Sequence, residues 1–178
     1  MSGPIDIWRP VADKWTAVYA RIDDSDWDTT TPCSEWTVRD LVEHNLDWQA
    51  TGGALLGAAT KPGDDWETIR AAYDAHLSDP SNLEGTVDDF GGIPKQELAG
   101  FMIGDLLIHS WDLARSIGED ETLPPAAVEA TMAGLHHVPA ELLRGRNPLG
   151  QPMMGPAVDI SDDAAVQDRM LAYTGRRA

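Results

Sequence analysis

The sequence predicts an all-α protein, and three observations carry this prediction. Apolar residues recur at steps of three and four along most of the chain, which is the period of amphipathic helices. Capping residues, prolines and glycines mark the ends of these periodic segments. Only the segment 78–94, rich in Gly, Asp and Pro, leaves room for short strands, and its strand signal is weak. Helices joined in this way are typical of a four-helix bundle with additional short helices.

The first helix is predicted from an apolar stripe between Trp8 and Ile22, about four turns long. Pro10 fits this helix only if it lies in the first turn, because an interior proline removes a backbone hydrogen bond. The acidic stretch that follows indicates a loop up to Pro32. Thr37 and Asp40 then form a capping-box pattern that predicts the start of the second helix.

The second helix is expected over 38–56 and the third over about 64–77, separated by the breaker Lys61-Pro62-Gly63. Pro94 and Gly118 delimit a fourth helix over about 95–117. The remaining elements are a fifth helix beginning at 124–125, a loop over 144–150, and a last helix capped by 161–163 and ending near 174. We therefore expect one domain over residues 1–178, with a short helical tail from about 157.

Charge and cysteine content restrict the classes of function. The chain of 178 residues carries 13 Lys and Arg against 30 Asp and Glu, a formal net charge of −17. Such an acidic surface repels phosphate backbones and anionic lipids, which argues against nucleic-acid and membrane partners. The single cysteine, Cys33, excludes an internal disulfide and a cysteine-based zinc cluster. With no bilayer-spanning apolar run and no signal-peptide pattern, we expect a cytoplasmic globular protein.

Two of the predicted helices carry side chains suited to a divalent metal. Asp105 and His109 lie four residues apart, so both project from one face of the fourth helix. His44 lies between Leu41 and Trp48 at helical spacing, and so also points to the apolar side of its helix. An inward-facing carboxylate is costly unless it is paired or bound to a metal. Two imidazoles and a carboxylate would leave open positions on the ion, as catalytic sites require.

Several alternatives stay open from the residues themselves. An Asp-x-x-x-His pair is commonly a helix-stabilising ion pair rather than a ligand set. Asp112 either holds the His109 imidazole as a hydrogen-bond acceptor or forms a local network with Arg115. Trp48, one turn after His44, is either a core residue or the wall of a pocket. Cys33 has no base near it in the sequence, which favours a structural thiol.

Two motifs resemble those of a known family. The run PCSEWTVRDLVEH at 32–44 resembles the start of the second helix in the mycothiol-dependent maleylpyruvate isomerase-like family, part of the DinB-like superfamily of metal-binding four-helix bundles. The run DLLIHSWDLA at 105–114 is similar to the family's second motif. The tail, with GPAV at 155–158, DRML at 168–171 and GR at 175–176, resembles the ending of a shorter actinobacterial branch.

The resemblance implies a DinB-like bundle that holds a divalent metal, usually zinc, through His44, Asp105 and His109. It also implies activation of a low-molecular-weight thiol such as mycothiol for transfer to, or isomerisation of, a small electrophile. The isomerase itself has Glu at the position of Asp105 and a sizeable C-terminal domain where this chain has only a tail. Maleylpyruvate isomerisation itself is therefore not the expected reaction.

The sequence thus leads to two hypotheses. The first is a metal-dependent thiol transferase or isomerase in which metal-bound thiol or water reacts, with zinc expected and nickel or iron compatible with the same ligands. The second is a metal- or ligand-binding bundle without catalysis, or a dimerising scaffold. A homodimer is compatible with either hypothesis.

Overall fold

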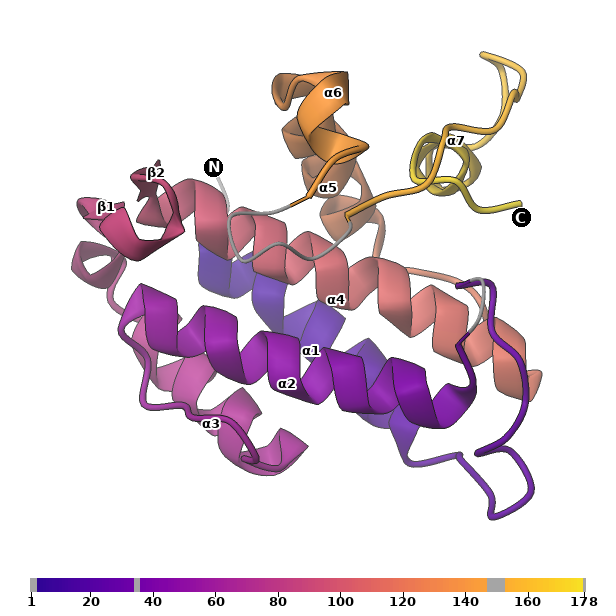
Figure 1. Cartoon of the computed structure of the whole chain (residues 1–178), viewed down its shortest axis with the longest axis horizontal. Helices are drawn as coiled ribbons and strands as arrows, with labels where there is room; N and C mark the ends of the chain where they lie inside the picture. Colours follow the sequence, from indigo (N-terminus) through magenta and orange to yellow (C-terminus); the bar gives the residue numbers. More distant parts are fainter. Residues whose placement is uncertain (1–2, 34–35, 147–152, 178) are drawn as a thin grey trace.

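In the computed structural model, described for residues 3–33, 36–146 and 153–177, the chain is mainly helical, which confirms the predicted all-α class. Four helices are α1 (Pro4–Tyr19), α2 (Val38–Leu56), α3 (Trp66–Leu77) and α4 (Lys95–Ile117). They contact one another in a closed ring, with α1 and α2 each packed against both α3 and α4. This arrangement is a four-helix bundle with α4 as its longest member (Figure 1).

Three further helices lie on the side of α4 away from α3 (Figure 1). They are α5 (Pro125–His137), α6 (Ala140–Leu143) and α7 (Val166–Tyr173). α5 packs against α4 and α1, and α7 packs against α5. Among the described residues, no helix combines the length and the apolarity needed to cross a membrane.

The segment between α3 and α4 holds the short strands that the sequence signalled only weakly. β1 (Thr86–Val87) pairs with β2 (Ile93–Pro94) in an antiparallel hairpin. Two 3-10 turns, η1 (Pro80–Leu83) and η2 (Asp88–Phe90), complete the segment. The hairpin places Ile93 beside the first turn of α4.

The helices that carry the predicted site have the expected bounds. α2 begins with a capping box in which Asp40 Oδ2 accepts from the Thr37 backbone amide at 2.9 Å. α4 ends at Gly118, whose φ of 74° is the left-handed conformation that glycine adopts without strain. These local signals fix the register of both helices, and with it the direction of each side chain along them.

Two expected boundaries are wrong. α1 begins at Pro4 rather than just before Pro10, because Asp6 accepts from the Gly3 amide at 2.9 Å and Pro4 fits the first turn. Pro10 therefore lies inside the helix, on its exposed side. The last helix begins after Ala165 and not at the predicted cap over 161–163, where Ser161 accepts from the Asp163 amide in a turn. Residues 147–150 of the predicted loop lie outside the described residues.

Buried polar contacts hold α2, α3 and α4 in register. The Gln49 side chain donates to the Met102 carbonyl at 2.9 Å, and the Tyr73 hydroxyl donates to the Gln49 carbonyl at 3.0 Å. Gly52 lets α2 and α4 approach closely, since a Cβ there would overlap the Met102 side chain. The hydrogen bond and the close approach thus fix the position of α2 relative to α4, next to the predicted ligand residues.

Candidate metal centre

The three predicted ligand residues meet between α2 and α4. His44 comes from the second turn of α2, and Asp105 and His109 come from successive turns of α4. One donor atom from each lies within 4.8 Å of the other two. The His44 and His109 rings are 5.3 Å apart between centroids and nearly perpendicular, at 79°. Two nitrogens and one carboxylate oxygen thus surround one point in space, as ligands of a single ion do.

Asp105 is the member of this cluster that most needs a cation. Its Oδ1 lies 3.7 Å from His109 Nε2, and its side chain is 17% exposed. Its Oδ2 is buried and has no hydrogen-bond partner. Buried carboxylate oxygens are nearly always hydrogen-bonded or bound to a cation. The orphaned oxygen and the two facing imidazoles therefore fit a divalent metal at this point.

His109 is held from its other side by Asp112. The ring Nδ1 lies 2.9 Å from Asp112 Oδ2. The neutral imidazole then carries its proton on Nδ1 and presents the Nε2 lone pair toward Asp105 and His44. Asp112 thereby sets the tautomer that a metal ligand needs. Arg115, its alternative partner, pairs instead with Glu121 at 2.9 Å.

Asp112 is itself neutralised by the C-terminal segment. It is fully buried, and the Arg176 guanidinium donates to its two oxygens at 2.8 and 3.1 Å. Arg176 also donates to the Thr174 carbonyl at 2.9 Å, which fixes its orientation. The C-terminal segment thus supports the metal-facing histidine from behind.

The ionisation of the histidines follows from these surroundings. Burial lowers the pKa of His44, so its imidazole is neutral at physiological pH. Burial also disfavours charged His109, but the Asp105 and Asp112 carboxylates outweigh it and raise the pKa of His109 to about 10. Burial of Asp112 is likewise outweighed, by Arg176 and His109, which hold the pKa of that carboxyl below its usual range. Without a metal, the cluster therefore binds a proton as its cation.

A second group of potential ligands shares His109. Cys33 Sγ lies 3.9 Å from His109 Nδ1 and 3.3 Å from Asp112 Oδ2. The Arg176 guanidinium, 3.4 Å from the same sulfur, already supplies a cation to this group. A metal would have to displace Arg176 from Asp112, so this group serves as a support for His109.

Sequence reasoning missed two parts of this neighbourhood. The Trp36 ring lies 4.5 Å from the His44 ring and 6.1 Å from the His109 ring, between centroids, and so packs against both imidazoles. Arg176 comes from a segment far along the chain, and no local pattern connects it to Asp112. Trp48 is 5% exposed and packs against Phe90, 6.1 Å away between ring centroids.

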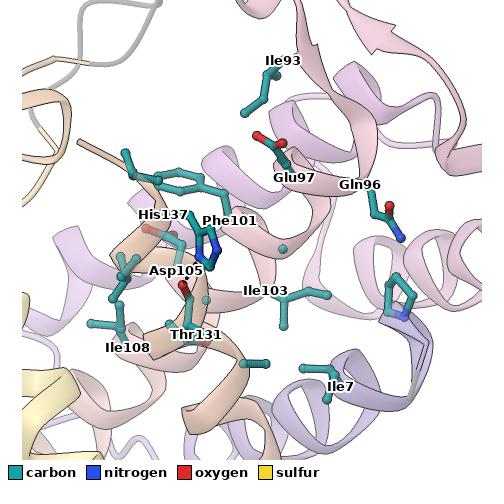
Figure 2. Close-up of a pocket in the computed structure, with 18 of the residues that line it drawn as sticks. Ile7, Ile93, Gln96, Glu97, Phe101, Ile103, Asp105, Ile108, Thr131 and His137 are labelled. Atoms are coloured by element: carbon teal, nitrogen blue, oxygen red, sulfur yellow. Dashed lines mark hydrogen bonds between the residues drawn. The ribbon is translucent and has the colours of Figure 1, made fainter. Parts of the chain in front are cut away.

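A cavity of about 770 Å³ lies against this cluster, and Asp105 is part of its lining. The other lining residues come mainly from α1, α4 and α5, and Figure 2 shows His137, Thr131 and Asp105 together on one side of it. Trp48 is not among the lining residues. Asp105, one of the three predicted ligand residues, therefore also lines a space large enough for a small molecule.

The fold and the cluster together define a class: helical bundles with a candidate divalent-metal site between two helices. Comparison with known proteins narrows it. Residues 8–93 match the family described as the mycothiol maleylpyruvate isomerase N-terminal domain, which confirms the predicted resemblance over that region. The matched region contains His44, whereas Asp105 and His109 lie beyond it.

Relatives over the whole length come from mycobacteria. The chain is 26% identical over 188 residues to "Uncharacterized protein Rv0738" of Mycobacterium tuberculosis strain H37Rv, covering 97% of each chain. The same identity and coverage hold for "Uncharacterized protein MT0763" of strain CDC 1551. No solved structure gave a significant match.

Proposed function

We propose that this protein binds one divalent metal ion through His44, Asp105 and His109, and uses it as a metal-dependent transferase or isomerase of a low-molecular-weight thiol of the mycothiol type. The observation that carries the proposal is a buried carboxylate beside two imidazoles: Asp105 Oδ2 has no hydrogen-bond partner, and one donor atom each of His44, Asp105 and His109 lies within 4.8 Å of the other two. The match to a mycothiol-related family over residues 8–93 supports the thiol.

The ligand types favour a catalytic rather than a closed structural site. Two imidazoles and one carboxylate suit zinc first, and nickel or ferrous iron as well. Three protein ligands leave positions for a thiol or water. A bound divalent metal lowers the pKa of such a group and so supplies a nucleophile at neutral pH.

The protein's own residues provide orientation and a dry surrounding. Asp112 fixes the His109 tautomer through Nδ1, and Arg176 keeps Asp112 ionised. The Trp36 ring packs against the two imidazoles and would limit the access of water to a metal on that side. Asp105 also lines the cavity, so an electrophile bound there would lie beside one residue of the proposed ligand set.

Metal analysis of protein purified without an affinity tag tests the ligand set. We expect one equivalent of metal per chain, lost in His44→Ala and in Asp105→Asn. His136→Ala is the matched control, because His136 is an exposed imidazole of α5 that lies outside the cluster and contacts the Tyr173 ring. Stoichiometric metal that survives in His44→Ala would refute the ligand set.

Turnover separates catalysis from binding alone. The metal-loaded protein is assayed with mycothiol and a panel of small electrophiles, with the Asp105→Asn variant as the metal-free reference. We expect thiol consumption that depends on the metal. Saturable metal binding without metal-dependent turnover across the panel would favour a non-catalytic metal-binding bundle.

A further inference from the structure

The cavity beside Asp105 is built mainly from apolar groups. Its lining includes Ile7, Ile93, Phe101 and Ile108, which come from α1, the hairpin and α4. α5 closes the opposite side with small side chains and with the polar Thr131 and His137. Its volume of about 770 Å³ lies within the range of pockets that bind small molecules.

Two glycines keep this cavity open. Gly100 of α4 and Gly134 of α5 both line it, and a Cβ added at either would meet nothing within 4 Å. Gly104 differs, since a Cβ there would lie 3.0 Å from Thr131 and disturb the packing of α4 on α5. Glycine inside a helix lowers its stability relative to alanine. Helix packing therefore does not require glycine at positions 100 and 134. Larger side chains at these positions would instead occupy the volume of the cavity.

The charges around the cavity select against anions. Glu97 and Asp105 are its two acidic lining residues, and the described lining contains no lysine or arginine. The charge of Asp105 is balanced within the proposed metal cluster, so a carboxylate or phosphate inside the cavity would face the Glu97 carboxylate without a lysine or arginine as counter-ion, in a chain whose formal net charge is −17. Apolar walls and acidic groups together favour a ligand that is neutral and mainly apolar.

We propose that this cavity binds the electrophile and that the electrophile is a neutral, mainly apolar small molecule rather than a carboxylate or a phosphate. The assignment of the ligand as an electrophile rests on the proposed function, because Asp105 is shared between the cavity and the ligand set. Binding of an apolar molecule in the cavity does not depend on the metal, so the two can fail separately.

A pair of fluorescent probes tests the chemical class. N-phenyl-1-naphthylamine is neutral, and 8-anilinonaphthalene-1-sulfonate has the same ring system with an added sulfonate. We expect saturable binding of the neutral probe at one site per chain and binding of the sulfonate weaker by about fivefold or more, a gap that narrows in Glu97→Gln. Equal affinity for the two probes would overturn the assignment of a neutral ligand.

A blocking variant tests the location. Gly134→Leu fills the cavity, and we expect it to weaken the neutral probe by about tenfold or more. Gly134→Ala adds only a methyl group, and Ala126→Leu places leucine on an exposed position of α5 outside the lining, so both should bind as the parent does. Unchanged probe binding in a folded Gly134→Leu variant would place the probe elsewhere and refute the proposal.

Metal content measured on the same samples keeps the two proposals apart. Gly134→Leu should retain its metal while losing the probe. Metal that survives in His44→Ala, together with probe binding that is lost in Gly134→Leu, would remove the proposed ligand set and leave the binding cavity standing. The reverse pair of results would leave the metal site standing and remove the cavity ligand.

Discussion

Asp112→Asn is the substitution with the most sharply defined consequences. Asp112 is fully buried, accepts from His109 at 2.9 Å, and forms a two-bond pair with Arg176 at 2.8 and 3.1 Å. Asparagine has nearly the same shape but no charge. Its amide group would also direct a donor at Arg176 or at His109. The substitution therefore leaves a buried guanidinium without a counter-ion and removes one of the two oxygens that accept from Arg176 and His109.

The expected cost is large compared with the stability of a small protein. The Arg176 side chain is 12% exposed, so water can replace little of the lost interaction. Removing one partner of a buried ion pair costs about 3–5 kcal/mol. Typical domains are stable by about 5–15 kcal/mol, so this cost is a large part of the total and should clearly lower the unfolding midpoint. Losing the group that orients a ligating histidine weakens metal binding by about 10–100-fold.

Urea unfolding of the metal-free protein measures the first effect, and competition with a chelator measures the second. Asp112→Asn, Arg176→Met and the double variant form a double-mutant cycle. We expect the double variant to be more stable than the sum of the single effects predicts, since neither charge is then left alone. The control is Glu121→Gln, which breaks an exposed pair with Arg115 at 2.9 Å and should cost less than about 1 kcal/mol. A cost of Asp112→Asn no larger than this control, or additive single effects, would refute the reasoning.

Three further predictions concern the helices and the ligands. Thr37→Ala removes the N-cap of α2 and should lower the free energy of unfolding by about 1 kcal/mol, measured by urea titration. The Thr37 hydrogen bonds hold the pKa of Asp40 below its usual value, so they stabilise the folded protein at a pH above that usual value and this effect is lost as the pH falls. The variant should raise the pKa of Asp40, measured by NMR titration. An unchanged pKa would contradict the capping box. Gly53→Ala should destabilise the protein by about 1–3 kcal/mol, because its Cβ would lie 2.5 Å from Thr60 Oγ1. Gly134→Ala should instead stabilise it by up to about 1 kcal/mol, because a Cβ there meets nothing within 4 Å. Thermal melts in which both variants shift the midpoint in the same direction would contradict this packing. Metal affinity should rise with pH through the neutral range. The reason is that the metal must displace the proton of His109, whose pKa is raised to about 10. A metal affinity that does not change with pH in competition with a chelator would contradict this exchange of proton for metal.

The parts of the fold that the sequence predicts correctly are those with local causes. The bounds of α2 and α4 follow from the Thr37–Asp40 capping box and from Gly118, which act within one or two turns. The juxtaposition of Asp105 and His109 follows from a spacing of four within one helix. Because α2 and α4 pack together in one bundle, His44 on the apolar side of α2 lies next to Asp105 and His109.

The parts that escape sequence reasoning depend on contacts between distant segments. Arg176 reaches Asp112 from 64 positions away, and Cys33 approaches His109 from 76 positions away. The cavity forms where α1, α4 and α5 pack against one another, and its lining therefore comes from segments far apart in the chain. The start of α1 differs from the predicted one for another reason: a cap at Gly3 begins the helix earlier, and Pro10 is then tolerated on its exposed side.

The charges around His109 connect the proposed metal to the proposed thiol cosubstrate. Two carboxylates, Asp105 and Asp112, flank its ring, and Arg176 neutralises only Asp112. With both histidines neutral, this cluster retains a single uncompensated negative charge, which explains why a proton is held so firmly on His109 when nothing else binds. A divalent cation in place of that proton would leave one positive charge to be balanced. A thiolate supplies that balance and a neutral thiol does not, so the same arrangement that favours a metal also favours the ionised form of a thiol cosubstrate.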